Sequence, residues 1–107
     1  MINKQMKVLI EQERNTDPHA YEDIQRIWDK EIEVLCFSLD DTISFLDSLE
    51  DEKDMILVAE VWDDISEYWK SKELIECMER CMARFPNIRN SLEVDIRYAR
   101  KAVEHDI

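Results

Sequence analysis

Apolar residues recur every three or four positions along most of the chain, the spacing of the buried side of an α-helix. Polar residues and prolines interrupt this pattern at intervals and divide it into segments. The pattern predicts six helices, over about Ile2–Glu13, Pro18–Phe37, Leu39–Leu49, Glu52–Trp69, Lys72–Phe85 and Ile88–Val103.

Local signals mark where several of these helices begin and end. Asp17 followed by Pro18 is a start signal, because aspartate accepts hydrogen bonds from first-turn N–H groups and proline has no N–H to leave unpaired. Ser38 and Ser71 stand in capping positions before two later helices. Pro86 cannot continue a helix, so we expect the fifth helix to end just before it.

The chain has no glycine and only two prolines in its 107 residues. Sheet proteins use glycine for tight hairpin turns and bulges, whereas short connections between helices can do without it. This length fits one domain. We therefore expect an all-α fold, a compact antiparallel bundle of about six helices, in a single domain over residues 1–107.

The aromatic residues add to the predicted core. Six of them fall on the apolar stripes, namely Tyr21, Trp28, Phe45, Trp62, Trp69 and Phe85. Tyr68 lies off the stripe of its helix and follows Glu67. We expect Tyr68 at the surface, where tyrosine is suited to anchor a contact with another protein.

The formal net charge is −12, with 26 acidic and 14 basic residues. This balance argues against binding to nucleic acid or to anionic membranes, because both require clustered lysine and arginine. No apolar run is long enough for a transmembrane helix, and the N-terminus lacks a secretory signal. Three cysteines cannot all pair within one chain, which favours a reducing compartment. We expect a cytoplasmic protein.

Most of the excess negative charge lies in the middle of the sequence. Residues 40–67 contain eleven acids, and Lys53 is the only base among them. Acids near helix starts complement the helix dipole. Asp63, Asp64 and Glu67 need another reason, because in a helix from Glu52 to Trp69 they lie toward the C-terminal end, where the dipole disfavours them.

Like charges stacked on one helix destabilise it by about a few tenths of a kcal/mol per pair. Their retention favours binding to a cationic partner, although a surface that serves solubility alone is the competing explanation. The predicted partner-binding residues are Asp40, Asp41, Asp47, Glu60, Asp63, Asp64, Glu67 and Tyr68.

Other chemistry finds little support in the sequence. A catalytic carboxyl group needs an apolar pocket that raises its pKa, and no acidic residue stands out as so placed. Calcium loops and phosphate-binding loops both need glycine. Cys77 and Cys81 are four residues apart, a spacing that suits buried small hydrophobes better than a zinc site. We expect no enzyme, no cofactor and no metal.

From Asp41 to Val103 the chain carries an ordered series of segments: an acid-flanked "ISFL" helix, "EVWDDISE", "SKELIECMER", an "FP" stop and a final "DIRYA" helix. This series resembles small all-helical bacterial immunity proteins of polymorphic and contact-dependent growth-inhibition toxin systems. The resemblance implies an inhibitor that binds a cognate toxin domain with a basic surface, often a nuclease. It implies no catalytic residues, and the first forty residues match it less clearly.

Three other functions stay open. An acidic adaptor or nucleic-acid mimic would bind a basic cellular protein in place of a toxin. An enzyme would need a metal ion or carboxyl groups with perturbed pKa values. A structural subunit would use its apolar stripes to form a helical oligomer. A toxin gene beside the gene for this chain would favour the immunity function over the adaptor.

Overall fold

The computed structural model describes residues 2–104. These residues contain seven α-helices and one short 3-10 helix, joined by short connections, and no strand. The elements are α1 (Asn3–Arg14), α2 (Tyr21–Leu35), α3 (Leu39–Ser48), α4 (Glu52–Ala59), α5 (Trp62–Trp69), α6 (Lys72–Arg84), η1 (Pro86–Ile88) and α7 (Arg89–Glu104). The predicted all-α fold is confirmed.

Side-chain caps begin three of the helices. Ser38 Oγ accepts the N–H of Asp41 at the start of α3, and Ser71 Oγ accepts the N–H of Leu74 at the start of α6. Both predicted serine caps are therefore confirmed. The Asp51 carboxylate accepts two first-turn N–H groups of α4 in the same way.

The predicted start of the second helix at Pro18 is wrong. The Asp17 carboxylate accepts the N–H of His19, and the Asp17 carbonyl accepts the N–H of Ala20. These bonds close a turn, and α2 begins only at Tyr21. An aspartate before a proline can start a turn as readily as a helix, because its side chain bonds the backbone two residues on.

The long helix predicted from Glu52 to Trp69 is divided into α4 and α5. The chain tightens at Glu60 and Val61, whose N–H groups donate to carbonyls three residues back instead of four. Val61 and Trp62 are both completely buried at this bend. The spacing of apolar residues continues through it without glycine or proline, so the sequence carried no signal for the break.

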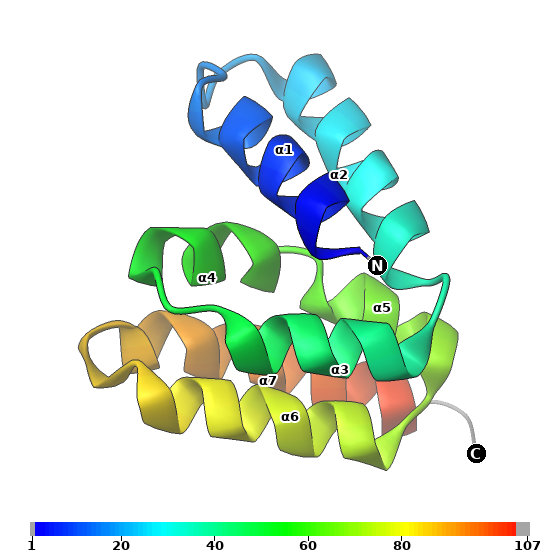
Figure 1. The fold of residues 1–107 in the computed structure, drawn as a ribbon. Coiled ribbons are helices and arrows are strands. Elements are labelled where there is room, and N and C mark those ends of the chain that lie inside the picture. Colours follow the sequence, from blue (N-terminus) through cyan, green and yellow to red (C-terminus); the bar gives the residue numbers. More distant parts are fainter. Residues whose placement is uncertain (1, 105–107) are drawn as a thin grey trace.

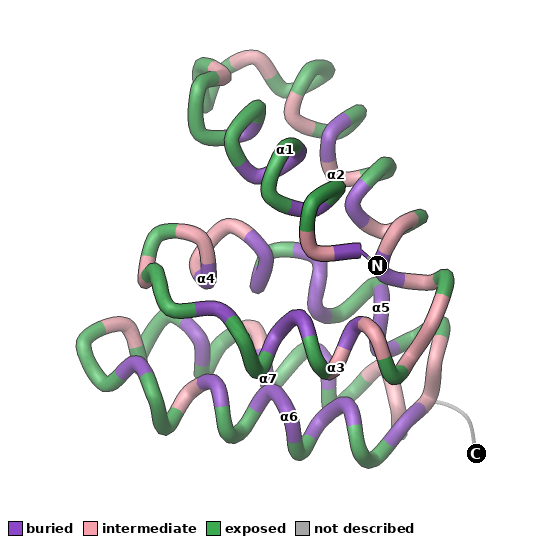
Figure 2. The backbone as a smooth tube through the Cα atoms, in the orientation of Figure 1, coloured by how far each residue is buried: buried purple, intermediate pink, exposed green. Residues whose placement is uncertain are grey.

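The helices α3, α6 and α7 lie alongside one another, with α5 packed against α7, while the α1–α2 hairpin sits across α4 (Figure 1). The end of α2 also contacts α3 and α5. Buried and exposed positions alternate along each helix (Figure 2). The largest fully buried side chains come from both parts of the molecule and include Met6, Leu46, Trp62, Met78 and Ile96.

Tyr21 does not join this core. It is the first residue of α2, where the hairpin leaves its outer side open, and 74% of it is exposed. The other five aromatic residues predicted for the core are buried or packed against it. None of the described helices has the length and apolar character that crossing a membrane requires.

Candidate protein-binding surface

The helix α5 carries three of the predicted partner-binding acids on its exposed side. Asp63 and Asp64 lie in the first turn of α5, and Glu67 lies one turn further on. Because α5 is a separate helix, the positive end of its dipole stabilises Asp63 and Asp64. Contrary to the prediction, Asp63 and Asp64 therefore do not lie at the C-terminal end of a long helix, and their charge needs no partner to explain it.

Carboxylates from other elements nevertheless gather around those of α5. Burial, followed by the charges of Asp63, Glu67 and Asp29, raises the pKa of Asp64. Burial, together with the charges of Glu60 and Asp63, raises the pKa of Asp95 on α7 to about 6. We call this group the acidic face, and it consists of Asp29, Glu60, Asp63, Asp64, Glu67 and Asp95.

The acidic face has no internal cation. No ion pair joins any of its six carboxylates to a lysine, arginine or histidine within residues 2–104. Tyr68 lies beside Glu67 with 63% of its surface exposed, as predicted, and its ring meets that of Trp69 edge-on. Tyrosine is enriched at protein interfaces, whose rims are polar.

The structure does not bring Asp47 into this group. Partial burial alone would raise the pKa of Asp47. Hydrogen bonds and charge from Arg80, with the charge of Arg84, outweigh it and hold this pKa below its ordinary value. Arg80 donates to Asp47 at 2.9 Å, so this carboxylate links α3 to α6. The Asp47 carboxylate is therefore already paired with arginine side chains of the same chain.

Asp40 and Asp41 lie in the first turn of α3, which explains their charge in the same way as for α5. Asp41 is half-buried and lines an open groove with Lys4 and Lys30. The predicted surface is thus divided: four of its acids belong to the acidic face, and three lie elsewhere.

A second group of acids includes two that the sequence did not single out, Glu13 and Glu31. Glu31 is completely buried and Glu13 is 5% exposed. The carboxyl groups of Glu31 and Glu60 both lie within hydrogen-bonding reach of that of Glu13, and a bond between two carboxyl groups requires a bound proton. We call Glu13, Glu31 and Glu60 the glutamate cluster. Trp28 Nε1 donates to Glu13 at 3.1 Å and to Glu60 at 2.9 Å.

Burial is the main reason why the pKa of each member of the cluster rises to about 7, and mutual charge adds to it. The expectation that no carboxyl group lies in such an environment is therefore wrong. A group of this kind can exchange a proton at neutral pH or, once ionised, hold a cation. The available signal was position: Glu13 and Glu31 stand at helical spacing from the buried Ile10 and Ile27.

Cys77, Cys81 and Asp47 offer three possible metal ligands within 4.8 Å of one another. Both thiols already donate to backbone carbonyls of α3, at 3.7 Å in each case. The guanidinium groups of Arg80 and Arg84 lie against Asp47, and their charge opposes that of a metal ion. This arrangement favours reduced cysteines packed in the core, and both are buried as predicted.

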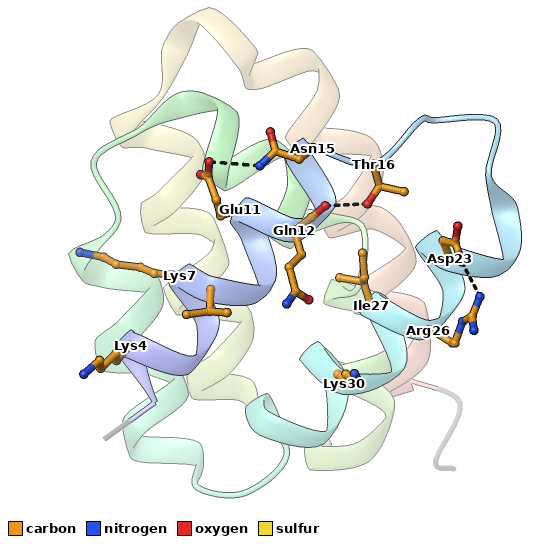
Figure 3. A pocket seen from close by; sticks show the side chains of 11 residues that line it. Lys4, Lys7, Glu11, Gln12, Asn15, Thr16, Asp23, Arg26, Ile27 and Lys30 are labelled. Carbon is orange, nitrogen blue, oxygen red and sulfur yellow. Dashed lines mark hydrogen bonds and ion pairs between the residues drawn. The ribbon is translucent and has the colours of Figure 1, made fainter.

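An open groove of about 950 Å³ follows the outer side of the α1–α2 hairpin. Gln12 and Ile27 face one another across it, while Lys4 and Lys7 extend away from it (Figure 3). Arg26 pairs with Asp23. The basic side chains here diverge, so the groove offers no focused anion site.

Comparison with known proteins identifies no relative. No protein-family model matches the chain, and neither a curated protein nor a solved structure is significantly similar to it. The resemblance to immunity proteins therefore stays a prediction.

Proposed function

We propose that this protein is an immunity protein, which binds a cognate bacterial toxin domain with a basic surface and blocks it. The observation that carries the proposal is the acidic face: six carboxylates from α2, α5, α7 and the bend between α4 and α5 lie together without an ion pair to any described cation. The resemblance of residues 41–103 to immunity proteins supports the same function.

The acidic face suits a toxin of the nuclease class. A nuclease needs a basic cleft to hold phosphates. A field of unpaired carboxylates accelerates encounter with such a cleft, and once bound it excludes the nucleic acid from the same charges. Tyr68, exposed beside Glu67, adds an apolar contact at the edge. No catalytic group is required of an inhibitor that acts by occupation.

Reversing the charge of the α5 acids tests this proposal. We expect Asp63→Lys with Asp64→Lys to slow association with the toxin by about tenfold or more at low salt, because steering depends on these charges. Association is measured by surface plasmon resonance and protection by growth of cells that express the toxin. The matched control is Glu50→Lys with Glu76→Lys, which changes net charge equally at two exposed acids outside the acidic face.

Unchanged association and full protection by the Asp63→Lys, Asp64→Lys protein, with a folded spectrum, would contradict the proposal. Because the cognate toxin is unidentified, the partner is first obtained by co-purification from the native host. Capture of a basic chromosomal or regulatory protein, with no toxin gene nearby, would favour the acidic adaptor or nucleic-acid mimic.

A further inference from the structure

A pocket of about 540 Å³ opens where the α1–α2 connection meets α4. Its walls are largely apolar: Pro18, Tyr21 and Ile24 come from the hairpin, and Ile56 and Leu57 come from α4. The pocket is lined by residues on both sides of the hairpin–α4 junction, so the packing of two separate parts of the fold creates it.

Carboxyl groups line this pocket together with Trp28. Glu13 and Glu60 both border it, and the indole N–H of Trp28 donates to each of them. Although Glu13 is only 5% exposed, no N–H or hydroxyl group of the described residues donates to its Oε1. The same holds for both carboxyl oxygens of the adjacent, completely buried Glu31. Carboxyl groups can bond to one another only while they hold protons, so the ionised cluster lacks a donor, and a buried polar atom left unpaired destabilises a fold by about 1–3 kcal/mol.

The described chain does not supply that donor as a cation. Arg14, at the rim of the pocket, is held by Asp54 and Asp51. Lys53 also lines the pocket, but it forms no ion pair with the glutamate cluster. No described lysine or arginine pairs with Glu13, Glu31 or Glu60.

We propose that the pocket receives an arginine side chain of the partner protein, with its guanidinium group hydrogen-bonded to Glu13 and Glu60. The apolar walls suit the aliphatic part of such a side chain, and Tyr21 and Trp28 offer aromatic rings on which a guanidinium can stack. A guanidinium has five N–H donors in one plane, which suits two adjacent carboxylates better than the three donors of an ammonium group. This proposal rests on the proposed function, because the cationic partner supplies the arginine.

Binding of the arginine should release protons. Glu13 and Glu60 have pKa values of about 7 and hold protons below that pH, whereas a guanidinium favours their ionised form. The other charged groups around them are Glu31 on α2, Asp95 on α7, and Arg14 and Lys53 at the rim. Release of one proton would tighten binding by about tenfold between pH 6 and pH 8.

The pocket can be tested without the partner, with n-butylguanidinium as the probe. We expect the indole N–H resonance of Trp28, assigned with Trp28→Phe, to shift saturably with a dissociation constant on the order of 1–10 mM at pH 8. Glu60→Gln and Glu13→Gln should each weaken this binding by about tenfold, because a neutral amide replaces an ionised partner. Glu76→Gln, an exposed acid on α6, is the matched control.

Two further probes show whether binding depends on the charge and on the shape of the guanidinium group. The neutral analogue n-butylurea should produce no saturable shift, and n-butylammonium should bind more weakly than n-butylguanidinium. Absence of saturation by n-butylguanidinium, equal binding of n-butylurea, or unchanged binding to Glu60→Gln would overturn the pocket proposal. Tighter binding of n-butylammonium would overturn the assignment to arginine. A silent pocket combined with loss of toxin binding in the Asp63→Lys, Asp64→Lys protein would leave the acidic face as the binding site and reject the pocket.

Discussion

Glu31 stands on the buried side of α2, one turn from the buried Ile27 and Leu35. An ionised carboxylate in such a place is strongly disfavoured unless it is paired, and Glu31 has no cation within the described chain. The pKa of about 7 is the consequence, since a protonated carboxyl group needs no counter-charge. At neutral pH the glutamate cluster therefore exists as a mixture of protonated and ionised forms.

Replacement of Glu31 tests this directly through the pH dependence of stability. The folded-state pKa of about 7 exceeds the ordinary value of 4.5, so the folded protein binds more protons between these pH values than the unfolded chain. The stabilisation from this group is complete below about pH 4.5 and is lost as pH rises through about 7. We expect the free energy of unfolding of Glu31→Gln, minus that of the wild type, to increase from pH 5 to pH 8 in urea titrations.

The matched control for this prediction is Glu33→Gln, two residues away and exposed on the same helix. Its difference from the wild type should stay flat over the same range. A flat difference for Glu31→Gln as well would show that Glu31 is already ionised in the folded protein at pH 5, and would reject the raised pKa.

Among the individual helices, the division between α4 and α5 decides whether the acids that follow it are stabilised or destabilised by a helix dipole. A single helix would place Asp63 and Asp64 in its unfavourable half, whereas the bend at Glu60 and Val61 makes them first-turn residues of a new helix. The bend also leaves Glu60 at the end of α4, where it meets Trp28 of α2. One local change of direction thus contributes to both the acidic face and the pocket.

The side-chain cap of α6 can be tested by its effect on stability. Ser71 is nearly buried and its Oγ accepts the N–H of Leu74, so Ser71→Ala leaves a first-turn donor of α6 unpaired. We expect the free energy of unfolding to fall by about 0.5–2 kcal/mol in urea titrations. Ser44→Ala, at an exposed position inside α3, should change it by less than about 0.5 kcal/mol. Equal effects of the two substitutions would argue against a capping role for Ser71.

At the scale of the whole molecule, one continuous core joins the α1–α2 hairpin to the remaining helices. Met6 from α1 and Leu46 from α3 are both completely buried in it, and α1 packs on α4. We therefore expect the two parts to unfold together, because the buried residues of both belong to one cluster.

Shortening one buried side chain in each part of the molecule tests whether the two parts unfold together. Met6→Ala and Leu46→Ala should each lower the free energy of unfolding by about 2–5 kcal/mol through lost burial and the cavity that remains. In both proteins the urea transitions followed by tryptophan fluorescence and by far-ultraviolet circular dichroism should coincide. Separate transitions in Met6→Ala would show that the hairpin unfolds independently.

The membership of the acidic face also depends on the packing of the whole molecule. Asp29, Asp64 and Asp95 come from α2, α5 and α7, and only the packing of these helices brings their charges within reach of one another. Asp63, Asp64 and Glu67 could be predicted as a group because they are close in the chain. Asp29 and Asp95 could not, because their places in the group depend on contacts between distant segments.

The helical class, the serine caps of α3 and α6 and most of the buried positions could be predicted from the sequence. These features depend on the helical period and on bonds between residues three or four apart. The tertiary structure alone decided that Glu13, Glu31 and Glu60 meet, that Asp47 is paired with Arg80, and that α4 ends where α5 begins. Contacts of this second kind depend on how helices cross, and periodicity along the chain specifies which side of a helix is buried but not which helix covers it.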